Sequence, residues 1–375
     1  MDLLSERDCI VSLATCPGLE PGTLRRLVAG CGSASRVWYG EPANWKEVCR
    51  LSETTVESLQ RWQRNITDGA MAESRLLDRS IRVVVRGDAD YPTRLHDLPE
   101  PPLAIFVKGK VDDLHSMFDR ENVVSIVGTR RASSYGLEAT RWIAGTIAAR
   151  GWHVVSGLAL GVDVCAHESA LGVQGVTSAV LASGVDLCYP VNHRRTYDAI
   201  GAAGCLISEY PPGTPVAKHR FPERNRLIAA LASVVIVVQA GEKSGALRTA
   251  EIALELGRDI YAVPGPITSV HYRGSNRLLA DGAAVLLNPE EFLYNHSDFV
   301  PSHSLTPAPP KRWQVLYEAL EEPLSAGVLA TKLGVPVSHV YAGLLELELE
   351  GWIERRPGAV YGRKPQNLHP NSAGC

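Results

Sequence analysis

The chain has 375 residues, of which 45% are hydrophobic and 21% charged, and its formal net charge is −3. This length is sufficient for two or three globular domains, and the composition excludes a disordered or fibrous chain. The nearly neutral balance also excludes a strongly basic protein, so any surface for nucleic acid has to be a local patch.

The eight cysteines show no C-x-x-C pair and no zinc-ligand spacing to a histidine. We therefore expect reduced thiols and no metal site. The N-terminus lacks the basic start and apolar core of a signal peptide, and the longest apolar runs are too short and too interrupted to span a bilayer. These features predict a soluble, cytoplasmic protein.

The first 75 residues predict a small helical module. A turn at 16–23, C-P-G-L-E-P-G-T, precedes an apolar helical pattern that begins at Leu24. In a helix–hairpin–helix module such a glycine turn offers backbone amides to DNA phosphate, and the same turn also occurs in plain helical packing. Because Glu6 and Glu20 surround it and few basic side chains do, we favour the packing role.

Residues 76–294 predict an α/β domain. Two strands are expected at 81–85 and 103–107. Helical stretches such as 139–149 and 246–256 then alternate with short apolar runs at 123–127, 152–156, 176–181, 205–208, 234–238 and 260–263. This alternation is typical of a parallel sheet covered on both faces, so we expect an extended Rossmann-like, doubly wound fold. Ligands of such sheets bind beyond the carboxyl ends of the strands.

The C-terminal part predicts a Pro/Ser linker at 295–311, a winged helix at 312–361 and a polar tail at 362–375. The candidate recognition helix starts near Ser338 and has almost no basic residues. Its charged positions are the acids Glu346, Glu348 and Glu350. We therefore favour a contact with protein, rather than a grip on DNA, for this unit.

The stretch F-P-E-R-N-R-L-I at 221–228 stands where a helix is expected to begin. Arg224, Asn225 and Arg226 carry N–H donors, as do the free backbone amides of a helix N-terminus. This combination suits a phosphate-rich ligand. A solvated helix start with arginine at its cap is the alternative interpretation.

The other loops at the same predicted edge also bring glycine, serine and basic residues. Gly128 lets the backbone turn closely, Ser133 or Ser134 can cap the next helix, and the loop at 156–163 exposes amides at a further helix start. The candidate DNA-binding residues are Gly128, Arg130, Arg131, Ser156, Gly157, Arg194, Arg195, Lys218, Arg224, Asn225, Arg226, Lys243, Ser244 and Gly245.

Three aromatic residues, Tyr189, Tyr210 and Phe221, are interleaved with these basic loops. Basic groups follow a nucleic-acid backbone, and aromatic faces stack on unpaired bases. The predicted sheet edge therefore suits single-stranded nucleic acid.

Motifs for other ligands are missing. The dinucleotide pattern G-x-G-x-x-G and its acidic ribose ligand are absent, and no P-loop frame precedes Lys243, so we expect no cofactor. Asp163 and His167 share a helix face and could form an acid/base pair. Because no nucleophile accompanies them, we prefer a helix cap at Asp163 with an orienting hydrogen bond to His167.

An ordered set of motifs runs through nearly the whole chain: G-T-R (128–130), S-G-L-A-L-G-V-D (156–163), V-L-A-S-G-V-D-L-C-Y-P (180–190), I-S-E-Y-P-P-G-T-P (207–215), F-P-E-R-N-R-L-I-A-A-L (221–231), S-G-A-L-R-T-A (244–250) and A-V-P-G-P (262–266). In this order the motifs resemble the DNA-processing protein A (DprA/Smf) family. The family's GTR arginine corresponds to Arg130, its FPxRNR arginines to Arg224 and Arg226, and the lysine upstream to Lys218.

The resemblance implies a single-stranded DNA-binding protein rather than an enzyme. Such a protein protects incoming DNA and loads the recombinase RecA onto it in natural transformation or homologous recombination. The resemblance also implies a SAM-like or helix–hairpin–helix-like N-terminal module, a Rossmann domain that forms a homodimer, and a C-terminal winged helix. Two positions depart from the family pattern: Val191 stands where a lysine often follows Tyr-Pro, and Gln239 replaces an acid at a strand end.

Two other functions stay open. One is a nucleotide-binding or nucleotide N-glycosidic-bond-cleaving Rossmann enzyme. The stretch S-G-A-L-R-T-A-E at 244–251 faintly resembles the P-G-G-x-G-T-x-x-E loop of the cleaving enzymes, although the paired glycines are missing. A winged-helix regulator of duplex DNA is the other, and the acidic candidate recognition helix argues against it.

Overall fold

The computed structural model describes residues 4–41, 45, 51–66, 69–77, 79–111, 113–296, 309–356 and 358–363. The chain divides into two compact units, Met1–Phe292 and Leu293–Cys375, which are described separately. Most of the predicted linker at 295–311 and of the predicted tail at 362–375 lies outside the described residues. The predicted boundary at residue 75 falls within a helix of the first unit and stays a prediction.

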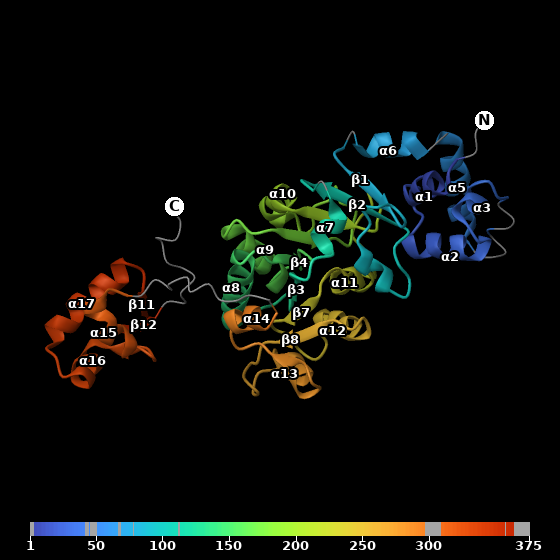
Figure 1. Cartoon of the computed structure of the whole chain (residues 1–375). Helices are drawn as coiled ribbons and strands as arrows, with labels where there is room; N and C mark the ends of the chain where they lie inside the picture. Colours follow the sequence, from blue (N-terminus) through green and yellow to red (C-terminus); the bar gives the residue numbers. More distant parts are fainter. Residues whose placement is uncertain are drawn as a thin grey trace. The chain divides into compact units, whose positions relative to one another are not determined.

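The first unit begins with a helical module, coloured blue in Figure 1. Its helices are α1 Glu6–Ala14, α2 Pro21–Cys31, α3 Ala34–Trp38, α5 Glu53–Asn65 and α6 Gly69–Leu77. Ser5, Ser33 and Ser52 accept hydrogen bonds from backbone amides at the starts of three of them, as N-cap serines do. The core of the module continues into the first two strands, because Leu24 and Leu27 share a buried cluster with side chains of both.

Within the described residues, one nine-stranded sheet forms the centre of the first unit, in the order β1-β2-β6-β5-β4-β3-β7-β8-β9. The strands are β1 Arg82–Val85, β2 Ala104–Gly109, β3 Val123–Val127, β4 His153–Ser156, β5 Thr177–Val180, β6 Cys205–Ser208, β7 Val234–Val237, β8 Asp259–Ala262 and β9 Ala284–Val285. Strands β3 to β9 pair in parallel, whereas β1 and β2 pair antiparallel with their neighbours. The strands β3 to β7 are buried throughout, which explains their continuous apolar runs.

Helices cover both faces of this sheet (Figure 1). Helices α8 Ser134–Ala149, α9 Val162–Gly172 and α10 Arg194–Ala203 pack together on one face, and α11 Arg220–Leu231 and α12 Gly245–Glu255 pack together on the other. The chain leaves β3 towards β4 and leaves β7 towards β8, so the direction of winding reverses between β3 and β7. This arrangement confirms the predicted Rossmann-like, doubly wound fold. The remaining elements of the unit are η1 Thr93–Asp97, α7 Leu114–Phe118, η2 Val191–His193, α13 Arg273–Ala280 and α14 Pro289–Asn295.

One local prediction is wrong. Helix α11 begins at Arg220, so Arg224, Asn225 and Arg226 lie in its second turn rather than at its N-terminus. The N-cap residue, His219, makes no side-chain capping bond, and Pro222 sits inside the first turn. Proline is tolerated there because its missing N–H would have no partner within the helix.

The second unit is a winged helix, as predicted. It comprises η3 Lys311–Trp313, α15 Gln314–Glu318, β10 Leu324–Ser325, α16 Ala326–Leu333, α17 Val337–Leu349, β11 Ile353–Arg356 and β12 Val360–Arg363. The three strands form a sheet in the order β10-β12-β11, and the core includes Trp313, Leu344 and Trp352. Helix α17 contains no lysine or arginine and exposes Tyr341 and Leu345.

No single helix in the described part of the chain is long and apolar enough to cross a membrane. Helices α16 and α17 reach that length and apolarity only when taken together, across a bend of 116°.

Candidate nucleic-acid interface

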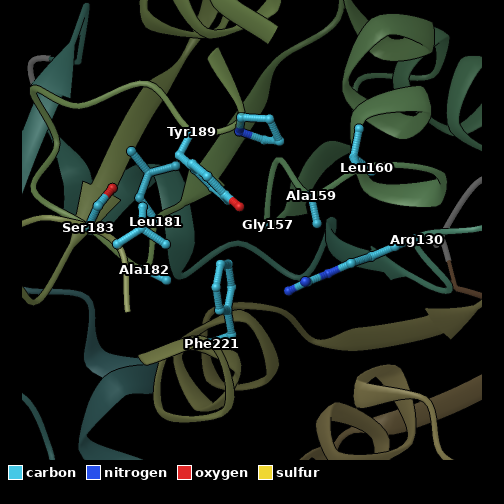
Figure 2. A pocket seen from close by; sticks show the side chains of 11 residues that line it. Arg130, Gly157, Ala159, Leu160, Leu181, Ala182, Ser183, Tyr189 and Phe221 are labelled. Atoms are coloured by element: carbon cyan, nitrogen blue, oxygen red, sulfur yellow. The ribbon is translucent and has the colours of Figure 1, made fainter. Parts of the chain in front are cut away.

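A small open pocket of about 50 Å³ lies at the carboxyl ends of the central strands. The loops that follow β3, β4, β5 and β6 all contribute to it, together with the start of α11 (Figure 2). Its lining residues are Arg130, Gly157, Ala159, Leu160, Leu181, Ala182, Ser183, Tyr189, Pro190, Val216 and Phe221. The pocket therefore lies where a doubly wound sheet binds its ligands.

An arginine and two aromatic rings give this pocket its chemical character. The guanidinium of Arg130 lies 4.5 Å from the centroid of the Phe221 ring, and the Tyr189 and Phe221 centroids are 6.1 Å apart. Figure 2 shows the Arg130 side chain reaching across the pocket towards Phe221. Arg130 is exposed and forms no ion pair with any other described residue. A cation–π contact of this kind orients the guanidinium and leaves its N–H donors free for an anion.

The loop that carries Arg130 is fixed by Gln239, which follows β7. The Gln239 carbonyl accepts a hydrogen bond from Thr129 N (2.8 Å), and its side-chain Oε1 accepts from Ser133 N (2.9 Å) and Ser133 Oγ (3.2 Å). Ser133 in turn caps α8 through Gly136 N. Because the side-chain oxygen makes both of these bonds, a carboxylate at position 239 would offer the same acceptor. Sequence reasoning missed this role of Gln239.

Arg224 is buried beneath the pocket. Its guanidinium donates to the carbonyl of Gly157 (2.8 Å) and to that of Val180, and its Nε donates to Asn225 Oδ1 (3.2 Å). Burial lowers the pKa of Arg224 to about 10, and the nearby carboxylate of Asp163 opposes this lowering. A Cβ on residue 157 would overlap the guanidinium, which explains the glycine there. Arg224 therefore joins the loop after β4 to the end of β5.

Asp163 and His167 complete this buried layer. The Asp163 carboxylate accepts hydrogen bonds from the backbone of Ala159 and Gly157, and burial raises its pKa. The N-cap of α9 is Gly161, so the predicted cap at Asp163 is wrong. The ring Nδ1 of His167 lies 2.7 Å from Thr177 Oγ1, and burial lowers the pKa of His167 to about 3. Asp163 thus supports the 157–161 loop, whereas His167 is neutral and is oriented by Thr177 of β5 rather than by the expected hydrogen bond with Asp163.

The other predicted residues fall into an exposed group and a structural group. Arg131, Arg195, Lys218 and Lys243 are exposed, and none of them forms an ion pair within the described part of the chain. Arg194 is exposed and pairs with Asp198 (2.9 Å). Arg131, Lys218 and Lys243 lie in the loops that follow β3, β6 and β7, and Arg195 lies in the first turn of α10. All four therefore belong to the segments that follow the carboxyl ends of parallel strands, although none of them lines the pocket.

The structural group consists of side chains that are buried or hydrogen-bonded within the protein. Ser156 Oγ donates to the carbonyl of Ile126 (2.6 Å), and Ser244 caps α12 through Ala246 N. The Asn225 Nδ2 group donates to the carbonyl of Gly245 (3.3 Å). Of the predicted set, only Arg130 and Gly157 line the pocket, and Gly128 lies in the loop before Arg130.

The apolar walls of the pocket were not in the predicted set. Leu160, which stands in a glycine-rich loop, is 49% exposed, and Val216 and Pro190 also line the pocket. An exposed leucine between two glycines is a sequence signal that points to a contact surface.

The sequence at 82–297 matches the family model of the DNA recombination-mediator protein A, and the sequence at 301–359 matches that of the DprA winged helix domain. The chain belongs to the DNA recombination-mediator protein A (DprA/Smf) family. Among DprA/Smf relatives, a protein Smf of Synechocystis is 30% identical over 96% of this chain and 99% of its own length. A protein Smf of Escherichia coli is 38% identical over 72% of this chain and 74% of its own.

Two solved DprA structures share the fold. The DNA processing protein A of Streptococcus pneumoniae superposes with a TM-score of 0.63 at 28% identity, covering 78% of this chain and 98% of that one. The DNA processing protein A of Helicobacter pylori, described with its single-stranded DNA binding mode, superposes with a TM-score of 0.52 at 30% identity. That match covers 57% of this chain and 94% of the other.

Proposed function

We propose that this DprA-family protein binds single-stranded DNA at the sheet edge formed by the pocket and the exposed cations around it. The observation that carries the proposal is the Arg130 guanidinium, held over Phe221 with no acidic partner among the described residues. The single-stranded DNA binding mode of the Helicobacter pylori relative supports it.

The chemistry of this edge fits an unpaired strand better than a duplex. Arg130, Arg131, Lys218 and Lys243 supply separate positive charges that suit successive phosphates. Tyr189, which is 48% exposed, supplies an aromatic face for an unstacked base. In a duplex the base faces are stacked inside the helix, so only the phosphate contacts remain available. We therefore expect selectivity for single strands.

We propose further that the protein protects incoming DNA and passes it to the recombinase RecA, in natural transformation or homologous recombination. It would act as a homodimer through the Rossmann domain, in the cytoplasm, as a binding protein without a catalytic step. Family membership supports these finer points.

Fluorescence anisotropy of a labelled oligo-dT strand tests the binding proposal, with unlabelled duplex of the same length as competitor. Affinity is expected to fall with salt at a log–log slope of about −0.7 per phosphate contacted, and duplex is expected to compete poorly. A flat salt response, or equal competition by duplex, would contradict the proposal. If no binding occurs, incubation with nucleoside monophosphates and assay for free base tests the glycosidic-bond alternative.

A further inference from the structure

A cluster of ion pairs joins the N-terminal helical module to the helix that carries Phe221. We call it the clamp, and it consists of Glu20, Arg25, Glu209, Arg220 and Arg226. Glu20 and Arg25 belong to the start of α2, Arg220 and Arg226 belong to α11, and Glu209 follows β6. All of these residues lie in the first compact unit.

Glu209 is the centre of one half of the clamp. Its carboxylate pairs with Arg25 through one oxygen and with Arg226 through the other, and the side chain is only 7% exposed. Glu100 adds to the same junction, because its carboxylate accepts from Arg25 Nε (3.2 Å) and its carbonyl accepts from Arg226 (3.0 Å). A buried carboxylate between two guanidinium groups holds both in fixed positions.

Arg220 is the centre of the other half and lies next to the pocket. Its side chain is 9% exposed, pairs with Glu20 and donates to the carbonyl of Pro215. Residues adjacent to both ends of that bond, Val216 and Phe221, line the pocket. Arg220 therefore fixes two walls of the pocket at once, and Glu20 is its ion-pair partner in the described part of the chain.

We infer that the N-terminal helical module positions the DNA site, with Glu20 and Arg25 acting through Arg220 and Glu209 on the pocket walls. This inference rests on the proposed function, since it concerns the same pocket. Glu20 holds Phe221 in place through Arg220, and Phe221 carries the guanidinium of Arg130. Glu20 and Arg25 are positioning residues, since neither lines the pocket.

The direction in which one substitution changes the DNA affinity distinguishes positioning from bulk electrostatics. Glu20→Gln removes a negative charge from the neighbourhood of a site for a polyanion, so electrostatics alone would strengthen DNA binding. Positioning has the opposite effect, because Arg220 becomes a buried cation with a neutral acceptor and the walls around it rearrange.

The test compares four full-length proteins by anisotropy with labelled oligo-dT: wild type, Glu20→Gln, Glu20→Asp and the matched control Glu242→Gln. Glu242 is an exposed acid in the loop after β7, outside the clamp and the pocket lining. Changes within such coupled networks alter affinity by between about 2-fold and 30-fold. We expect weakening in that range for Glu20→Gln, near wild-type affinity for Glu20→Asp, and unchanged or tighter binding for Glu242→Gln.

Hydrogen exchange of the 211–221 segment provides a readout that does not depend on DNA. Faster exchange there in Glu20→Gln than in Glu242→Gln supports the positioning of the pocket walls by Glu20, whether or not DNA binds. If wild type fails to bind oligo-dT, the proposed function is wrong and the pocket that Glu20 positions is not a DNA site. If wild type binds and Glu20→Gln binds equally well or more tightly, the inference is overturned. It is also overturned if exchange in the 211–221 segment is the same in both variants.

Discussion

The arginines of the loop after β3 and those of helix α11 lie in or beside two motifs of the ordered set, and they have different environments. Arg130 and Arg131 are exposed and unpaired within the described residues, whereas Arg220 and Arg224 are buried and Arg226 is half-buried in an ion pair. The donors of the first group are free for a ligand. The donors of the second group are already used to join loops, strands and the N-terminal module.

Under the proposed function, these two groups of arginines have different roles. A guanidinium with free donors gains a charge-assisted hydrogen bond when a phosphate arrives. A buried guanidinium would first have to give up its internal partners, which costs several kcal/mol and leaves those partners unpaired. We therefore assign contact with DNA mainly to the loop, and support of the pocket mainly to α11.

The largest expected effect is on stability, from Arg224→Ala. The variant removes the positive charge that stabilises the nearby buried carboxylate of Asp163 and the donor that Arg224 offers to two buried carbonyls, so we expect a loss of about 3–5 kcal/mol in the free energy of unfolding. Urea unfolding of wild type, Arg224→Ala and Arg130→Ala measures it. Arg130→Ala should change stability by less than about 0.5 kcal/mol. Similar losses of stability in both variants would contradict the distinction between buried, structural arginines and exposed ones.

The next largest effect is expected from low pH, which should reduce the stability of the folded protein through its buried histidines. Burial lowers the pKa of His153 to about 4 and that of His167 to about 3, so both stay neutral in the folded protein while the unfolded chain takes up protons below about pH 6.5. Their contribution to stability is complete above that pH and declines as the pH falls. Between pH 6.5 and pH 5 the loss is about 1.6 kcal/mol for each histidine.

The pH dependence is measured by urea unfolding across that range for wild type and His167→Gln. The variant should show a smaller decline than wild type, by about the share of one histidine. Identical pH dependence in the two proteins would mean that His167 is not held neutral by its buried position.

The role of the exposed arginines is tested by measuring the affinity for DNA. Arg130→Ala should weaken binding of oligo-dT by about 1–3 kcal/mol, because a charge-assisted hydrogen bond to phosphate is lost. The matched control is Arg248→Ala, which removes the same charge from α12, where Arg248 already pairs with Glu251 at 3.0 Å. Equal losses in both variants would show that only overall charge matters, and would remove Arg130 from the site.

The smallest effect is expected from the winged helix. Deletion of residues 312–375 should change the affinity for oligo-dT by less than about 0.5 kcal/mol, because α17 has no lysine or arginine and its acid Glu346 is already paired with Arg312. Anisotropy with the truncated chain measures this. A large loss would overturn the assignment of this unit to protein contacts.

Sequence patterns predicted the alternating strands and helices well, because apolar periodicity and glycine turns are local. The runs at 123–127 and 205–208 coincide with β3 and β6. Arg130 was also predictable as a residue at a strand end, since the order of strand, glycine and arginine is contained in a few residues.

The partners of the α11 arginines could not be predicted in this way, because they are distant in sequence. Arg224 reaches Gly157 and Val180, and Glu209 meets Arg25, through contacts that only the folded sheet brings together. The start of α11 was missed for a local reason, since proline within the first turn and the lack of a capping side chain obscure it.

The most direct test of the central claim is to find where an unpaired base lies on the protein. Oligo-dT carrying 5-iodouracil would be cross-linked by ultraviolet light to the full-length chain, and the attached peptide identified by mass spectrometry. We expect attachment at Tyr189 or Phe221, in the pocket beside Arg130. Attachment confined to the winged helix, at 309–363, or to the outer strands β1 and β2 would contradict it.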